Sequence, residues 1–359
     1  MTYKRSFQIS FFAIIILLAF IAAFNYSIDS GRIFSESEYE RGIANIITTK
    51  KNVANIENYD ERLVQKYIIN KFNEAKDIVV IGSSRTMQIR QDLFIDKTFF
   101  NNSVSGASLE DYIAIISLYN KKGLLPKKII IGLDPWILNK NSDQNRWKSI
   151  ESEYYDIIDD ISYSNENKKQ NKQFENIYKY HNLISMPYLK KSLSQYKDLI
   201  INKNNGYFAT DKYESEVAIK LNDGSISYPY KVKNVNEKDV DKLAFEYTNT
   251  KSIYSLANFN ELDNESKDRF EKFILYLKSK NIEIVFILPP YHPIVYNKIN
   301  SDNKYKMVNE AENYFNKVAT ENGIISIGSY NPYKCNLTGN DFFDGMHLKL
   351  EGINKLVRL

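Results

Sequence analysis

The chain has 359 residues, of which 43% are hydrophobic and 26% are charged. This balance is typical of a folded globular protein and excludes a disordered, collagen-like or coiled-coil chain. The formal net charge is only +4, so the composition does not indicate the concentrated basic surface of a nucleic-acid-binding protein. A single cysteine, Cys335, excludes an intramolecular disulfide bond and a multi-cysteine metal site.

The N-terminus predicts a membrane segment. Lys4 and Arg5 precede an almost unbroken apolar run over residues 9–24. With its flanks, this run is about long enough to span a bilayer as a helix. A cleaved signal peptide has a similar pattern, but the run does not end in a small-x-small cleavage site, which favours a retained anchor. The preceding positive charges predict a cytoplasmic N-terminus. We therefore expect a single-pass anchor over residues 1–26, with the rest of the chain outside the cytoplasm.

Residues 27–76 are predicted to form a polar juxtamembrane segment and a helical lead-in, with a helix over residues 61–71. Short apolar runs then have the composition of buried parallel strands. They cover residues 77–82, 98–102 (the weakest), 128–132, 282–288 and 323–327. Helical stretches lie between them, over residues 109–119 and 268–280. This alternation predicts a three-layer, flavodoxin-like α/β domain with a parallel sheet, formed by residues 77–138 and 251–359.

Residues 139–250 interrupt this alternation. Residues 162–173 are rich in Asn, Lys, Ser and Gln and are predicted to be a solvated loop, whereas residues 151–158 and 189–200 have a helical pattern. The segment is too long for a simple connection. We therefore expect an inserted, mostly helical cap.

Small and polar residues follow each predicted strand, where ligands bind in parallel sheets. Residues 82–85 (Gly-Ser-Ser-Arg) follow the first strand, Gly106 lies beyond the second and Asp134 follows the third. Near the C-terminus, Asp344 and His347 precede a short final helix. These residues predict a site at the carboxyl edge of the sheet.

The residue types indicate nucleophilic catalysis. A serine becomes a good nucleophile when a base removes its proton and a third group orients that base. Asp344 and His347 have the spacing to form such a pair, which leaves the second ring nitrogen of His347 free to face Ser84. Backbone N–H groups at Ser84 and Gly106 are positioned to stabilise an oxyanion.

Each candidate also has a structural interpretation. Ser84 could cap the following helix, with Ser83 as the reserve nucleophile, and Asp344 and His347 could form a purely structural pair. Arg85 could bind a substrate carboxylate or phosphate, or form an exposed salt bridge.

The remaining aromatic and histidine candidates have the same two interpretations. Trp136 could stack on a sugar or pack in a loop. His292 could line the site or be a loop histidine, whereas His181 and Cys335 are predicted to be structural and inert, respectively. No pattern of a metal or nucleotide site is present, so no cofactor is expected.

These motifs resemble the SGNH/GDSL hydrolase superfamily. The resemblance covers residues 77–134 and 283–359 and lies in four blocks in the family's order: Gly82-Ser83-Ser84, Gly106, Gly132-x-Asp134 and Asp344-x-x-His347. It implies that Ser84 is the nucleophile, His347 the general base and Asp344 its orienting group. The implied oxyanion hole is formed by Ser84, Gly106 and the position of Asp134, where the family has an asparagine. A carboxylate there repels an oxyanion unless it is protonated or turned aside.

The membrane segment and the Gly-Ser-Ser block are most similar to the envelope-modifying branch of that superfamily, which includes the D-alanyl-lipoteichoic acid transfer protein and the alginate-type O-acetylation proteins. The resemblance implies transfer of an acetyl or alanyl group to a cell-envelope polysaccharide or teichoic-acid-like polymer, with a membrane-bound O-acyltransferase as a possible partner. A carbohydrate esterase and a catalytically inactive assembly or binding protein are the alternatives.

Overall fold

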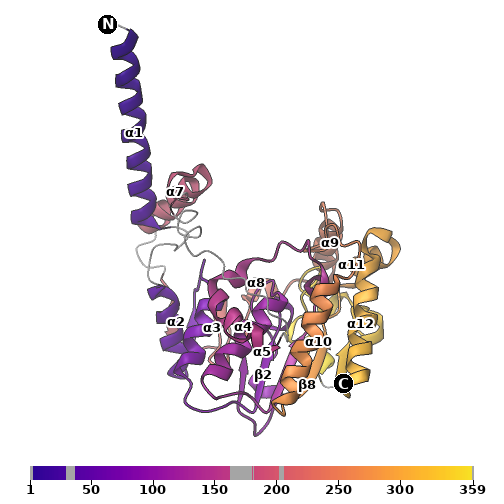
Figure 1. Cartoon of the computed structure of the whole chain (residues 1–359). Coiled ribbons are helices and arrows are strands. Elements are labelled where there is room, and N and C mark those ends of the chain that lie inside the picture. Colours follow the sequence, from indigo (N-terminus) through magenta and orange to yellow (C-terminus); the bar gives the residue numbers. More distant parts are fainter. Residues whose placement is uncertain (1–2, 30–36, 162–179, 181, 202–205, 358–359) are drawn as a thin grey trace. The chain divides into compact units, whose positions relative to one another are not determined.

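Figure 1 shows the computed structural model of the chain, which describes residues 3–29, 37–161, 180, 182–201 and 206–357. The chain divides into two compact units. The first comprises residues 1–39 and 166–206, and the second comprises residues 40–165 and 207–359.

The first unit contains the N-terminal helix α1 (Tyr3–Ile28). This helix is long and apolar enough to cross a membrane, which agrees with the predicted membrane segment. The end of α1 packs against η5 (Asn182–Ile184) and α7 (Met186–Ile201). Asn25 donates a hydrogen bond to the carbonyl of Leu183 (2.7 Å), and the Tyr188 hydroxyl donates to Asp29 (2.7 Å). Part of the predicted cap therefore belongs to the same unit as the membrane helix.

The second unit is built on a five-stranded sheet in which all pairs are parallel, in the order β3-β2-β4-β8-β9. The predicted α/β class with a parallel sheet is confirmed. The strands are β2 (Ile78–Ile81), β3 (Phe99–Asn101), β4 (Lys128–Gly132), β8 (Glu283–Leu288) and β9 (Ile325–Gly328).

Successive residues of each central strand face two different core clusters, because side chains alternate across a sheet. Val79 and Ile129 belong to a cluster that includes residues of the helices α4 (Leu109–Lys121), α10 (Asn264–Ser279) and α12 (Lys306–Asn322). Val80 and Ile130 belong to a second cluster that includes Ile353 of α13 (Leu350–Val357). Both faces of the sheet are therefore buried, which explains why the strand sequences are continuously apolar.

Helices of the second unit, several of them labelled in Figure 1, surround the sheet. They are α2 (Glu38–Thr48), α3 (Glu61–Lys71), α4 (Leu109–Lys121), α5 (Glu151–Ile161), α8 (Tyr230–Lys233), α9 (Glu237–Thr248), α10 (Asn264–Ser279), α11 (Pro293–Ser301), α12 (Lys306–Asn322) and α13 (Leu350–Val357). Short 3₁₀ helices include η1 (Ser84–Thr86), η3 (Pro135–Leu138) and η4 (Arg146–Ile150).

A second, antiparallel sheet was not predicted from the sequence. Its order is β5-β1-β6-β7, and it joins β1 (Asn52–Ala54) of the lead-in to three strands of the insertion: β5 (Phe208–Thr210), β6 (Ile219–Lys220) and β7 (Ile226–Ser227). Each strand has only two or three residues, which is too short for an alternating pattern to be recognised. The cap is therefore not purely helical.

The strand predicted over residues 323–327 starts two residues later in the structure and ends at Gly328. Gly323 has a left-handed conformation (φ 65°) and ends α12, so the strand begins only at Ile325. Glycine commonly ends a helix in this way. The predicted loop over residues 162–173 and the candidate residue His181 lie outside the described residues.

Candidate active site

Ser84, His347 and Asp344 are in hydrogen-bond contact. Ser84 lies 2.9 Å from Nε2 of His347, although the two residues are 263 positions apart. Nδ1 of the same ring lies 2.7 Å from the carboxylate of Asp344. A carboxylate only accepts hydrogen bonds, so Nδ1 carries the ring proton and Nε2 is left to accept from the Ser84 hydroxyl.

The turn before α13 holds Asp344 in place. One of its carboxylate oxygens accepts hydrogen bonds from the backbone N–H groups of Met346 and His347, both at 2.8 Å. Burial raises the pKa of the Asp344 carboxyl, but His347 and these two N–H groups outweigh it, so the pKa lies below its ordinary value. Asp344 is therefore an anion that can orient His347 and stabilise its protonated form.

An aromatic neighbour fixes the plane of the His347 ring. The rings of Phe343 and His347 are stacked, with centroids 5.4 Å apart and an interplanar angle of 2°. The backbone N–H of Phe343 also donates to the carbonyl of His347 (3.1 Å). Both contacts restrict the ring rotation that would break its hydrogen bond with Ser84.

The loop after β2 places Ser84 at the carboxyl edge of the sheet. Ser83 is fully buried and its hydroxyl accepts from the backbone N–H of Arg85 (3.2 Å), so Ser83, not Ser84, caps η1. Close packing at the end of β2 favours glycine, because a side chain at Gly82 would collide with Oγ1 of Thr86 and lie 3.2 Å from Cα of Gly132 on β4. Ser84 is left partly exposed beside His347.

The loop after β3 lies beside the Ser84 loop. The backbone N–H of Val104 donates to the carbonyl of Gly82 (3.0 Å). Two residues further on, Gly106 has a positive φ of 55°. Within the described part of the chain, the backbone N–H groups of Ser84 and Gly106 donate no hydrogen bond to another residue. Among those residues, neither donor is therefore committed to a protein acceptor.

The start of α3 holds this second loop. The Glu61 carboxylate accepts from the backbone N–H and from the hydroxyl of Ser105, the latter at 2.8 Å. Arg62 donates to the Ser105 carbonyl (3.1 Å) and forms a buried ion pair with Asp111. These residues were not predicted as part of the site, because the helical pattern gives no sign of which loop the helix contacts.

Arg85 and Asp134 form a fully buried ion pair, with 2.8 Å between Nη1 and the carboxylate. Arg85 also donates to the carbonyls of Met346 (3.1 Å) and Pro289, and its guanidinium lies over the Tyr291 ring. Burial raises the pKa of the Asp134 carboxyl, and the charge of Arg85 opposes that shift. Arg85 therefore has a protein partner, where a substrate anion was one expectation, and its salt bridge is buried, not exposed as predicted. The Asp134 carboxylate is directed to Arg85.

The other two predicted substrate-binding residues are also buried. Trp136 is 1% exposed, and its indole N–H donates to the carbonyl of Ala107 (2.9 Å). His292 is fully buried at the start of α11, where its Nδ1 accepts from the backbone N–H of Ile294 (3.2 Å). Both side chains support loops around the site, and both are almost completely buried.

Comparison with known families places the chain by sequence. Residues 15–359 match a family described as "Protein of unknown function (DUF1574)". The chain belongs to this family. The match extends from within α1 to the C-terminus, so it includes the candidate triad. No curated protein matched this DUF1574 member.

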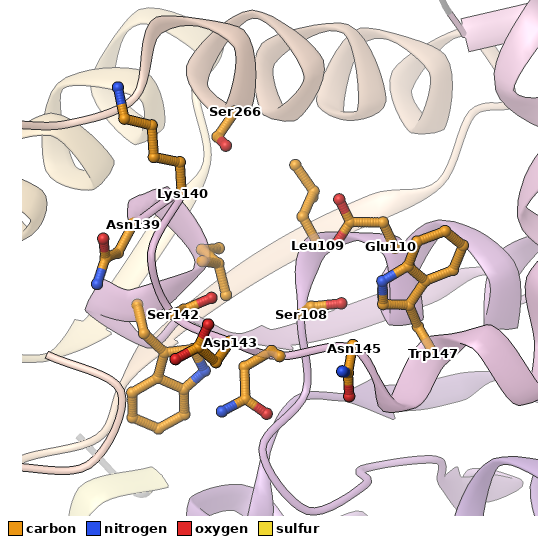
Figure 2. A pocket seen from close by; sticks show the side chains of 13 residues that line it. Ser108, Leu109, Glu110, Asn139, Lys140, Ser142, Asp143, Asn145, Trp147 and Ser266 are labelled. Atoms are coloured by element: carbon orange, nitrogen blue, oxygen red, sulfur yellow. The ribbon is translucent and has the colours of Figure 1, made fainter. Parts of the chain in front are cut away.

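A pocket of ≈ 270 Å³ lies next to the loop that follows Gly106 (Figure 2). Trp136 and Gln144 line it, together with polar side chains such as Asp143 and Asn145, but the triad residues do not.

Among the residues that the structure describes, no group of three or more His, Cys, Asp or Glu side chains is arranged to hold a metal ion.

Proposed function

We propose that this protein is a serine acyltransferase that forms an acyl-serine intermediate on Ser84. The observation that carries the proposal is the hydrogen-bonded chain from Ser84 through His347 to Asp344. This constellation activates a serine in enzymes of unrelated folds, so its geometry supports the reaction type independently of the fold.

The sheet topology supports the resemblance to the SGNH/GDSL superfamily. In chain order the five parallel strands are arranged 2-1-3-4-5, which is the order of flavodoxin-like sheets. Ser84 and Gly106 lie beyond the carboxyl ends of β2 and β3, two neighbouring strands. Ligands bind at this edge of such sheets.

In the first half-reaction, Ser84 Oγ attacks the carbonyl carbon of an acyl donor while His347 Nε2 accepts the hydroxyl proton. The N–H groups of Ser84 and Gly106 stabilise the oxyanion that forms. The intermediate then collapses, the bond to the leaving group breaks, and His347 returns the proton to that group.

In the second half-reaction, an acceptor hydroxyl loses its proton to His347 and attacks the acyl-serine, which releases Ser84 and restores its proton. A sugar hydroxyl as acceptor gives acyl transfer, and water gives the esterase alternative. The apolar helix α1 favours transfer, because anchoring suits a donor delivered by a membrane partner such as a membrane-bound O-acyltransferase. The proposed acceptor is an extracytoplasmic envelope polysaccharide or a teichoic-acid-like polymer.

Labelling with a fluorophosphonate probe tests this proposal. Wild-type protein is expected to be labelled on Ser84, and Ser84→Ala is expected to lose the label. His347→Gln should lower the labelling rate by about 10²–10⁴-fold, the usual contribution of a general base. Ser326→Ala is the matched control, because this serine on β9 is also partly buried and its hydroxyl donates to Asn316, which is not a residue of the triad.

Two results would contradict the proposal. One is a wild-type protein that stays unlabelled under conditions that label a known serine esterase. The other is a label that persists in Ser84→Ala, for example on Ser83. The first result would leave the non-catalytic binding protein as the better interpretation, and the second would exclude Ser84 as the labelled nucleophile.

A further inference from the structure

Three polar side chains cover Gly106, the proposed oxyanion-hole glycine. A side chain at Gly106 would lie 2.7 Å from Oε1 of Gln144 and would also collide with the guanidinium of Arg146 and the hydroxyl of Tyr254. All three residues lie close to a backbone N–H that we propose contacts the reacting carbonyl. We call Gln144, Arg146 and Tyr254 the Arg146 cluster.

The Arg146 cluster is held by hydrogen bonds. Nη2 of Arg146 donates to the Tyr254 hydroxyl (2.7 Å). Gln144 donates to the hydroxyl of Ser255 (2.5 Å), and the Tyr254 ring packs edge-on against Trp136, with 5.5 Å between centroids. These contacts restrict the movement of the guanidinium, which lowers the entropic cost of binding a ligand to it.

The Arg146 cluster is also connected to the loop that carries His347, the proposed general base. The backbone N–H of Tyr254 donates to the hydroxyl of Tyr247 (2.8 Å). Tyr247 in turn contacts Sδ of Met346 (3.4 Å), and its ring would lie 2.7 Å from a side chain at Gly345. The cluster thus continues from the oxyanion loop to the turn that contains Asp344 and His347.

Arg146 differs from three other arginines of this unit in its partners. Arg62, Arg85 and Arg269 each form an ion pair with a carboxylate. In the described part of the chain Arg146 forms none, and its side chain is exposed. Its Nη2 bonds only to neutral oxygens, so a cation faces the candidate site with its charge uncompensated by an ion pair.

We propose that Arg146 binds an anionic group, a carboxylate or a phosphate, carried by the substrate next to the ester that is formed or broken. This inference rests on the proposed function, because the location of the cluster beside Gly106 matters only if Gly106 contacts the reacting carbonyl. A planar guanidinium pairs well with both kinds of anion through two parallel hydrogen bonds. Arg146 was not predicted as a site residue, because no motif in the insertion distinguishes it from other surface arginines.

Competition by simple anions tests the inference. In this assay the full chain in detergent is given p-nitrophenyl acetate as the substrate, and inorganic phosphate and acetate are added in separate series at constant ionic strength. We expect at least one anion to inhibit competitively, and Arg146→Gln to raise that inhibition constant by roughly tenfold or more, as loss of a charged hydrogen bond predicts. Arg146→Lys should restore part of the inhibition.

The control is Lys148→Gln, which removes the same charge from an exposed residue two positions away and should leave inhibition unchanged. Inhibition by phosphate alone identifies a phosphate-bearing substrate, and inhibition by acetate alone identifies a carboxylate-bearing one. Equal inhibition of wild type and Arg146→Gln, or no inhibition of wild type, would overturn the inference.

A second readout does not depend on turnover. An anion bound to the native state raises the thermal unfolding midpoint, so phosphate or acetate should stabilise wild type more than Arg146→Gln. If ester hydrolysis is not lost in Ser84→Ala, the proposed function fails, and this thermal shift then decides the anion site separately. Equal shifts in both proteins would overturn the anion site.

Discussion

The buried guanidinium of Arg85 neutralises Asp134 close to the candidate nucleophile. Arg85 follows Ser84 in the chain, and its Nε donates to the carbonyl of Met346, the residue before His347. One side chain therefore links the nucleophile loop to the turn that carries the base. An isolated carboxylate at position 134 would repel an oxyanion, and the ion pair with Arg85 removes that conflict.

Removing the charge of Asp134 should be costly, because it leaves the Arg85 cation buried and unpaired. We expect Asp134→Asn to lower the free energy of unfolding by about 3–5 kcal/mol, measured by urea denaturation in detergent. The double variant Arg85→Met/Asp134→Leu should lose less free energy of unfolding than the summed losses of the single variants Arg85→Met and Asp134→Leu. Strictly additive losses would show that the pair is not energetically coupled.

Ser84, Asp344 and His347 were chosen from motifs, because a triad needs particular residue types and short local spacings. The partner of Asp134 could not be chosen in this way. Arg85 is 49 positions from Asp134. From the sequence alone, a substrate anion was an equally good partner for Arg85. The distance between strand ends in the folded sheet decided between them.

At the scale of elements, apolar runs predicted the central strands well. The predicted strand over residues 128–132 coincides with β4, and the predicted helix over residues 61–71 coincides with α3. The latter begins after Asp60, whose carboxylate accepts from two backbone N–H groups of the first turn. Buried parallel strands and capped helices carry local signals, so their bounds follow from nearby residues.

The start of α11 depends on a neutral histidine. Burial lowers the pKa of His292, and the Asp241 carboxylate, 3.3 Å from Nε2, opposes that shift together with Asp344. Above the ordinary imidazole pKa of about 6.5, the folded and unfolded chains are both neutral here. Below that pKa the unfolded chain binds a proton at His292 more readily than the folded chain does. The free energy of unfolding therefore falls as the pH falls from about 6.5 through the lowered pKa of the folded state.

We therefore expect His292→Asn to weaken the loss of stability between about pH 7.5 and about pH 5.5. Asparagine is also a good N-cap, so the variant should keep the start of α11. The measurement is the free energy of unfolding by urea at several pH values in that range. Identical pH slopes for wild type and variant would exclude His292 as the titrating group.

At the scale of the whole molecule, the apolar helix α1 and the α/β unit differ in where their apolar side chains can be buried. The helix has the length and composition of a membrane span, whereas the α/β unit buries its apolar strands within itself. The first unit joins α1 to residues of the insertion, so the insertion contributes to both units.

The full chain should stay in the membrane fraction after an alkaline carbonate wash. Replacing Ile16 and Leu17 with lysine should release it, since each charge at the centre of a span costs about 2.5–3.5 kcal/mol of insertion. Ile16→Leu/Leu17→Ile is the matched control and should remain bound. A shorter, soluble mature chain in the wild type would instead identify residues 1–26 as a cleaved signal peptide.

The sequence by itself determined the apolar N-terminal helix, the α/β class and the residue types available for a serine mechanism. These features depend on local composition, periodicity and short spacings, which are properties of neighbouring residues. Only the tertiary structure decided that Asp134 pairs with Arg85, that Trp136 and His292 are buried, and that Gln144, Arg146 and Tyr254 cover Gly106. Those outcomes depend on which strand ends and loops meet in space, and no local signal in the chain encodes such long-range contacts.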